Sequence, residues 1–431
     1  VELFGQELND ESFGICKSDM LVTGHDPEQI AFGNTLTQDA HAGKKFHYML
    51  SNPPYGVDWK KYQDPIKSEA ENMGMEGRFG AGTPRISDGQ LLFLQHMISK
   101  MRDDEDGSRI GIVMNGSPLF TGSAQSGESE IRRWMLENDW VEAIVALPTD
   151  LFYNTGIQTY VWLLTNRKPR NRRGKIQLID ASGERFTNTM RRSLGSKRKE
   201  ISDDARAEIV KIYARFLNGE SEENEVSKIF DIEDFGYREI RVERPLRLRF
   251  QVNDEAISRL DEQKAFSKLS EEDKRIVRHA LREIGDKKFV NREKFKGAIK
   301  EVFKNAGIKV GAPTTNAILL ALSERDDRAD ICLDGKGNPE PDPNLRDTEL
   351  VPMKEAWQTY FAREVSPFLK DAWVDEAYTD QKDKKVGRVG FEINFNKQFY
   401  HPELPRPLPE IQEELQDIQK TVERLMRELA A

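Results

Sequence analysis

The chain has 431 residues, of which 37% are hydrophobic and 32% are charged, and its formal net charge is −9 at pH 7. It contains no run of 18 apolar residues, which excludes a typical membrane-spanning helix, and its length suits two or three domains. Two cysteines are too few for a disulfide framework or a cysteine zinc site and suit a cytoplasmic protein. The chain begins at Val1 without a methionine, and we expect a further part of the protein to precede it.

The first 180 residues alternate between short apolar runs, which predict strands, and helical apolar spacing. The predicted strands are 2–5, 30–32, 46–50, 109–114, 140–147, 158–165 and 175–180, and the predicted helices are 12–22, 90–101 and 128–138. Strands separated by helices indicate the α/β class, with a largely parallel, doubly wound sheet. Residues 59–88 show no clear period, and we expect a functional or mobile segment there.

Beyond about residue 186 the chain becomes more charged and helical patterns dominate. We therefore divide it into a catalytic domain over 1–185, a connecting helical segment over 186–250, a helical region over 251–404 and a terminal helix over 405–431. The terminal helix carries a short heptad seam, which fits either a partner's coiled coil or the chain's own surface. The members of this seam are Ile411, Leu415, Ile418, Val422, Leu425 and Leu429.

Polar residues follow three predicted strands, at Glu7, Asn34 and Asn52. Ligands of a doubly wound sheet bind beyond the carboxyl ends of its strands, so these residues are candidates for one site. The Glu7 carboxylate suits the two hydroxyls of a ribose, and the Asn34 amide suits an adenine edge, as a nucleotide-type cofactor requires. Each also has a plain alternative, because acids are often solvated and asparagine often forms turns.

The third strand ends in Asn52-Pro53-Pro54-Tyr55, the most informative feature of the chain. The two prolines fix φ and remove two backbone donors, which leaves carbonyls that can face a ligand. The Asn52 amide adds an acceptor, and the Tyr55 ring adds a flat stacking surface. These groups suit a planar ring with an exocyclic amino group, as in enzymes that methylate a flipped-out base. The plain alternative is a rigid turn with a packed tyrosine.

With these motifs in their order and spacing, the chain resembles the modification (methyltransferase) subunits of type I restriction-modification systems. The resemblance covers nearly the whole chain. It rests on FGQELN (4–9), GNTL (33–36), SNPPYG (51–56), SDGQ (87–90), GIVMNGSPLF (111–120), TGIQT (155–159), VERPLRL (242–248) and GFEINF (390–395).

This resemblance implies a Rossmann-like methyltransferase sheet, incomplete at its N-terminus, followed by a mainly helical C-terminal region. The implied activity is that of a site-specific, S-adenosyl-L-methionine-dependent DNA-methyltransferase that modifies N6 of adenine. The implied partners are DNA, a DNA-specificity subunit that meets the terminal helix, and a second copy of the chain, with a restriction (motor or nuclease) subunit as a further candidate and no membrane. The family's Gly-rich cofactor loop is absent and would lie before Val1, and Asn34 replaces an aspartate that is commoner in the family.

The resemblance also assigns roles to individual residues. The catalytic set is Asn52, Pro53, Pro54 and Tyr55: the Asn52 oxygen and the Pro53 carbonyl accept the amino hydrogens of an adenine that lies on Tyr55. Glu7, Asn34 and Asn52 form the cofactor-binding set, and no metal is needed.

Two other functions stay open at this point. An Asn-Pro-Pro-Tyr turn also serves enzymes that methylate a protein glutamine amide at N5, but these are small and need no long helical region. The chain can also be a catalytically inert assembly subunit of a DNA-bound complex. Two basic clusters, at 167–175 and 191–199, are either phosphate contacts or merely solvated.

Overall fold

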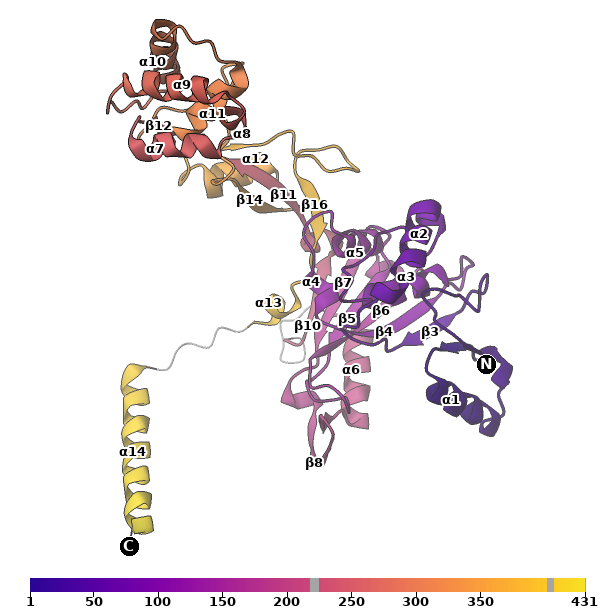
Figure 1. Ribbon diagram of the computed structural model, residues 1–431. Helices are drawn as coiled ribbons and strands as arrows, with labels where there is room; N and C mark the ends of the chain where they lie inside the picture. The colour runs from indigo at the N-terminus through magenta and orange to yellow at the C-terminus, as the bar shows by residue number, and fades with distance from the viewer. Residues whose placement is uncertain (218–224, 401–406, 431) are drawn as a thin grey trace.

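The structure is a computed structural model that describes residues 1–217, 225–400 and 407–430. At its centre is a six-stranded sheet with the strand order β10-β7-β5-β6-β4-β3 (Figure 1). The predicted α/β class is therefore confirmed. The strands of this central sheet are β3 (Tyr48–Ser51), β4 (Arg109–Asn115), β5 (Val141–Ala146), β6 (Thr159–Thr165), β7 (Lys175–Asp180) and β10 (Ser227–Asp231).

The central sheet is mixed, which corrects the expectation of a largely parallel one. β3 is parallel to β4 and β5 to β7, whereas β6 is antiparallel to both β4 and β5, and β10 is antiparallel to β7. The chain passes from β5 to β6 through a loop without a crossover helix, so it turns back instead of continuing in parallel. Because β4 and β5 both oppose β6, the carboxyl ends of β3, β4, β5 and β7 share one edge of the sheet.

A separate pair of parallel strands precedes the central sheet. β1 (Gly5–Glu7) pairs with β2 (Ile30–Phe32), and α1 (Asp10–Val22) connects them. The Asn9 side chain caps α1 by accepting a hydrogen bond from the Ser12 backbone N–H.

The segment over 59–88, which showed no period in the sequence, contains a helix. The helices of this part of the chain are α2 (Gln63–Met73), α3 (Gln90–Ser99), α4 (Ser117–Phe120) and α5 (Gly127–Glu137). Trp59, Ile66 and Phe79 are buried against Leu36 and Leu92. A few well-placed apolar side chains therefore order the segment, although they are too sparse to form a recognisable helical pattern.

Residues 186–250 were expected to be helical, and that expectation is wrong. They contain β8 (Asn188–Leu194), β9 (Lys197–Glu200), α6 (Asp203–Arg215), β10, β11 (Gly236–Glu243) and β12 (Leu248–Phe250). β8 and β9 form a hairpin, β10 adds to the edge of the central sheet, and β11 pairs with strands beyond residue 346. These strands depend on cross-strand partners that are mostly distant in the chain, which local charge and periodicity do not reveal.

The C-terminal part contains a helical lobe and a second sheet. The lobe packs around buried residues that include Phe250, Phe266 and Phe295. Its elements are α7 (Asp254–Ser258), α8 (Lys264–Ser267), α9 (Glu271–Arg282), α10 (Arg292–Asn305), α11 (Ala312–Ala321) and β13 (Ser323–Arg325). In the second sheet, β11 pairs with β14 (Asp347–Pro352), β15 (Trp373–Val374) and β16 (Arg388–Phe391), and the short helices α12 (Trp357–Tyr360) and α13 (Phe395–Phe399) complete this part.

The terminal helix α14 (Leu408–Ala430) exposes every side chain over 408–428. Five members of the predicted seam, from Ile411 to Leu425, are therefore open to solvent. The side chain of Leu429 and the predicted boundary between 404 and 405 lie outside the described part. Within the described ranges, no helix combines the length and the apolar character needed to cross a bilayer.

Residues from β16 onward return to the central sheet, where Val389, Phe391 and Ile393 join its core. A fully buried arginine on α5 holds this return in place. The Arg132 guanidinium donates to the carbonyl oxygens of Phe391 (2.6 Å) and Pro118 (3.0 Å). Burial lowers the pKa of Arg132 to about 10, which still leaves it charged at neutral pH. The C-terminal part is thus tied to α4, the short helix that follows β4.

Replacing Arg132 by methionine removes these donors and leaves two buried carbonyl groups without partners. We expect Arg132→Met to lower the free energy of unfolding by about 2–4 kcal/mol. Urea unfolding followed by circular dichroism measures the change. The control is Arg206→Met on α6, where the side chain is 66% exposed and the loss should stay within about 0.5 kcal/mol. Equal losses in both variants would contradict the role given to Arg132.

Candidate functional site

The Asn52-Pro53-Pro54-Tyr55 turn lies directly after β3, at the edge where the carboxyl ends of four strands meet. Pro53 is buried, Tyr55 is half-buried, and Asn52 and Pro54 are exposed. A buried proline anchors the turn while the asparagine amide remains accessible to a ligand. The half-buried phenol fits a stacking surface as well as the plain alternative of a packing ring.

The two polar side chains of this turn contact each other. The Tyr55 hydroxyl donates a hydrogen bond to the Asn52 side-chain oxygen. Burial raises the pKa of Tyr55 to about 12, so the hydroxyl remains a donor at neutral pH. An amide oxygen has two lone pairs, and Asn52 can therefore accept one further hydrogen bond from a ligand.

A second aromatic ring lies beside Tyr55. Phe152 approaches it edge to face, with 6.2 Å between ring centroids and 72° between ring planes. Phe152 is half-buried and belongs to the loop that follows β5, at the same edge of the sheet. No sequence motif singled out Phe152. The available signal was its place in the loop after a predicted strand, next to the TGIQT motif.

Glu7 and Asn34 lie together at the end of the two-stranded sheet. Glu7 is in register with Phe32, and the Gly33 N–H donates to the Glu7 carbonyl at 2.9 Å. One Glu7 carboxylate oxygen accepts from the Asn9 N–H at 2.7 Å, and the Asn34 side-chain oxygen accepts from the Leu36 N–H at 2.9 Å. Both side chains thus stabilise their own loops, and each retains a further oxygen or the amide NH₂ group that a ligand can use.

The predicted site residues are therefore divided between two sheets: Glu7 and Asn34 on the pair of strands, and Asn52 to Tyr55 on the central sheet. Arg78, another residue that no sequence motif singled out, connects them. Its guanidinium donates to the Thr35 and Leu36 carbonyls at 2.7 and 3.0 Å. The same group forms a salt bridge with Glu69 on α2 at 2.6 Å. The loop after Asn34 is thereby held against the segment that follows the Asn-Pro-Pro-Tyr turn.

A half-buried histidine supports this connection. The Nδ1 atom of His96, on α3, lies 3.2 Å from an Arg78 guanidinium nitrogen and must accept from it, because arginine only donates. Burial, with a smaller contribution from the Arg78 charge, lowers the pKa of His96 to about 4. The imidazole is therefore neutral at pH 7 and serves as a structural acceptor.

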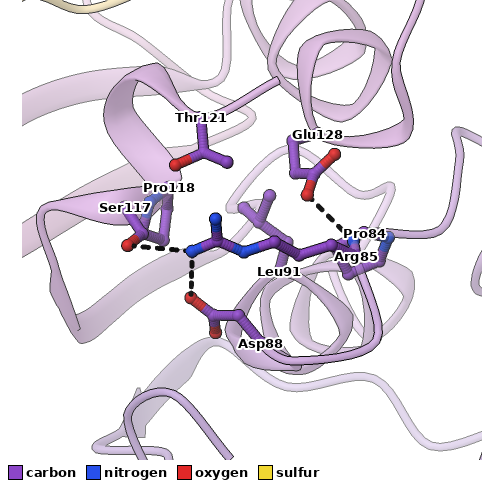
Figure 2. Close-up of a pocket in the computed structure, with 8 residues that line it drawn as sticks. All are labelled: Pro84, Arg85, Asp88, Leu91, Ser117, Pro118, Thr121 and Glu128. Atoms are coloured by element: carbon purple, nitrogen blue, oxygen red, sulfur yellow. Dashed lines mark hydrogen bonds and ion pairs between the residues drawn. The ribbon is translucent and has the colours of Figure 1, made fainter. Parts of the chain in front are cut away.

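A small pocket lies at the end of β4, where the Arg85 side chain extends across it toward Ser117 and Asp88 (Figure 2). The guanidinium donates to the Ser117 hydroxyl at 3.3 Å, and the Glu128 carboxylate accepts from the Arg85 backbone N–H at 2.8 Å. The cavity volume is about 10 Å³, which is room for about one water molecule and far below the roughly 300–1,000 Å³ of typical small-molecule sites. A complete nucleotide cofactor does not fit here. Among the described residues, no cluster of three or more histidine, cysteine or acidic side chains is suited to a metal ion.

The fold and site define an α/β protein with an amide, prolyl carbonyls and aromatic rings at the carboxyl edge of its sheet. Residues 1–247 match the family model described as N-6 DNA Methylase. The chain belongs to this family.

Similar proteins include the type I restriction enzyme MjaVII methylase subunit of Methanocaldococcus jannaschii. It is 29% identical to this chain over 237 residues, and the aligned part covers 54% of this chain and 38% of that protein. The HindI methylase subunit of Haemophilus influenzae is 30% identical over 183 residues, 42% of this chain and 38% of that protein. The chain thus spans well under half the length of these relatives. Among solved structures, a type I restriction-modification methyltransferase subunit from Streptococcus thermophilus aligns with a TM-score of 0.45 and 24% identity, over 55% of this chain and 46% of that one.

The lowered pKa of His96 gives a test of the Arg78 connection. Between pH 6.5 and 4 the unfolded chain takes up a proton that the folded chain does not, so acidification reduces the free energy of unfolding. From pH 7 to pH 5 we expect His96 to contribute about 2 kcal/mol to this loss, which His96→Gln should abolish. Urea unfolding at both pH values measures it. His279→Gln, at an exposed position on α9, should keep the full pH dependence.

Proposed function

We propose that the chain is the methyltransferase subunit of a type I restriction-modification complex and that it transfers a methyl group to N6 of a flipped-out adenine in DNA. The observation that carries the proposal is the accessible Asn52–Tyr55 turn at the carboxyl edge of the sheet, in a chain of the N-6 DNA Methylase family. The named relatives, which are methylase subunits of type I restriction enzymes, support the assignment. We place the complex in the cytoplasm, with its DNA.

In the proposed reaction, the target adenine leaves the base stack and lies on Tyr55, beside Phe152. The Asn52 side-chain oxygen and the Pro53 carbonyl accept the two amino hydrogens, and Pro54 keeps the turn rigid. These hydrogen bonds draw the amino lone pair out of conjugation with the ring and aim it at the incoming methyl carbon. The nitrogen then loses one proton. Positioning of this kind can lower a barrier by on the order of 7–11 kcal/mol.

The proposed methyl donor is S-adenosyl-L-methionine, which supplies an electrophilic methyl group when bound. The free carboxylate oxygen of Glu7 suits its ribose hydroxyls, and the Asn34 NH₂ group suits an acceptor nitrogen of its adenine. Asn52 completes this set beside the transferred methyl group. The open hydrogen-bonding capacity of Glu7 and Asn34 supports the assignment, and the two loops that carry them are already ordered by local hydrogen bonds.

The proposed partners are DNA and a DNA-specificity subunit, which binds the exposed heptad seam of α14. Five apolar seam residues between 38% and 60% exposed support this contact, because apolar stripes on soluble proteins mark interaction sites. Two copies of the chain per complex, and a restriction subunit as a further partner, complete the proposed assembly.

The catalytic proposal is tested with the full-length protein together with its specificity subunit, by transfer of labelled methyl groups to DNA. We expect Asn52→Ala to abolish transfer and Tyr55→Ala to weaken capture of the target base by about 1–3 kcal/mol, the usual scale of one base–aromatic stack. Fluorescence of 2-aminopurine at the target position reports base capture. Tyr48→Ala, which removes a 78% exposed ring from the same strand, should change neither. Transfer that survives loss of Asn52, or transfer to protein alone, would refute the proposal.

The contact of α14 is tested by placing charge on its seam. Leu415→Asp with Ile418→Asp should weaken association with the specificity subunit at least 100-fold, because burial of each side chain contributes about 1.5–3 kcal/mol. Gln416→Asp with Gln419→Asp adds the same charge beside the seam and should have little effect. Binding is measured by calorimetry. If the two double variants bind alike, the seam is not the contact.

A further inference from the structure

The two basic clusters of the chain differ in what their side chains contact. In the first cluster, the Arg167 guanidinium donates to the carbonyls of Asp103 and Asp104, at 2.7 and 3.0 Å. Lys168 is buried and lies 2.5 Å from an Asp139 carboxylate oxygen. Two other members also interact with side chains of the protein. Arg172 forms a salt bridge with Glu142 and lies over the Tyr213 ring, and Lys175 forms a salt bridge with Asp231. Most of the first cluster therefore serves the protein's own structure.

The second cluster lies on the β8–β9 hairpin, which projects below the central sheet in Figure 1. Residues 188–200 carry five basic side chains and one acidic side chain, Glu200, a local net charge of +4 in a chain of net −9. Within the described ranges, none of the five is ion-paired with a carboxylate, and three of them are exposed. The five are Arg191, Arg192, Lys197, Arg198 and Lys199.

The hairpin is anchored on the loop that carries Phe152. The Tyr153 carbonyl accepts from the Ser196 N–H at 2.8 Å, and the Asp150 carbonyl accepts from the N–H groups of Arg198 and Lys199 at 2.9 and 3.1 Å. Gly195 has a φ of +62°, and a Cβ atom there would meet the Tyr153 carbonyl oxygen at 2.4 Å. The chain thus uses glycine to bring the hairpin turn against this loop.

We infer that the basic side chains of the β8–β9 hairpin bind the phosphates of the DNA strand beside the flipped adenine. The same short loop carries the backbone contacts of the hairpin and the Phe152 ring that lies against Tyr55, so the hairpin and the proposed base-binding ring are attached to one segment. Double-stranded DNA presents one phosphate charge per ~1.7 Å of its axis, which matches a dense row of unpaired cations. The inference rests on the proposed function, because it takes DNA as the substrate.

The test uses the full-length protein with its specificity subunit and measures binding to a duplex by fluorescence anisotropy over a salt series. Arg191→Gln, Arg192→Gln and Arg198→Gln together remove three exposed charges. We expect the slope of log K against log salt to fall by about 2–3, and affinity at ~0.1 M salt to fall on the order of tenfold or more. Lys288→Gln, Lys294→Gln and Lys300→Gln remove equal charge from exposed positions on the helical lobe and should leave both unchanged.

A photo-crosslinking amino acid at Ser193, an exposed hairpin position, locates the contact. We expect crosslinks to the DNA backbone within a few nucleotides of the target adenine. An unchanged salt slope, crosslinks to a protein subunit only, or no DNA binding by the unaltered complex would overturn the inference. Methyl transfer by the unaltered complex is measured separately. An unchanged salt slope in the hairpin variant, with intact DNA methylation, therefore rejects this inference alone. Weaker DNA binding by the hairpin variant, without any DNA methylation, rejects the proposed function and the position beside a flipped adenine but keeps the phosphate contact.

Discussion

The common direction of β3, β4, β5 and β7 is the constraint on which the rest of the site depends. β6 runs against both of its neighbours, so it separates two parallel pairs without reversing either of them. The Asn52 turn, the Ser117 loop and the Phe152 loop therefore leave the sheet at one edge. The hairpin follows β7 and docks at that edge as well. Residues from four distant parts of the chain lie along this carboxyl edge because the strands that carry them run in the same direction.

Two arginines then fix the borders of this edge. Arg78 donates to the carbonyls of the loop after Asn34, and Arg132 donates to carbonyls of α4 and of β16. A guanidinium has five donors in a rigid plane, so one side chain can join segments that are far apart in sequence. Arg78 is also paired with an acid, whereas Arg132 is held by backbone groups and has its pKa lowered by burial. Both act as structural connectors, and the proposed chemistry belongs to the strand ends.

For the proposed substrate, a polyanion, an acidic chain must concentrate its positive charge locally. The two basic clusters of this chain differ in the groups that surround each cation, and not in the number of cations. The cluster over 167–175 is largely paired with nearby carboxylates and carbonyls, whereas the cluster over 191–199 is held on a hairpin that is anchored by backbone hydrogen bonds and by Lys197, which lies over the Tyr153 ring. The other basic side chains of the hairpin therefore remain available to a ligand.

The α/β class and the polar ends of the strands could be predicted from the amino-acid sequence, because a strand tip and its next few residues interact locally. The Asn52–Tyr55 turn is readable in four consecutive residues for this reason. The folded chain was needed to show that the sheet is mixed, that Phe152 lies against Tyr55, and that the Asn34 oxygen accepts a hydrogen bond within its own loop. The Asn34 hydrogen bond is short-range. The mixed sheet and the Phe152–Tyr55 contact depend on pairings between residues that are distant in the chain. Composition and periodicity record which side chains are present, but not which of them face one another after folding.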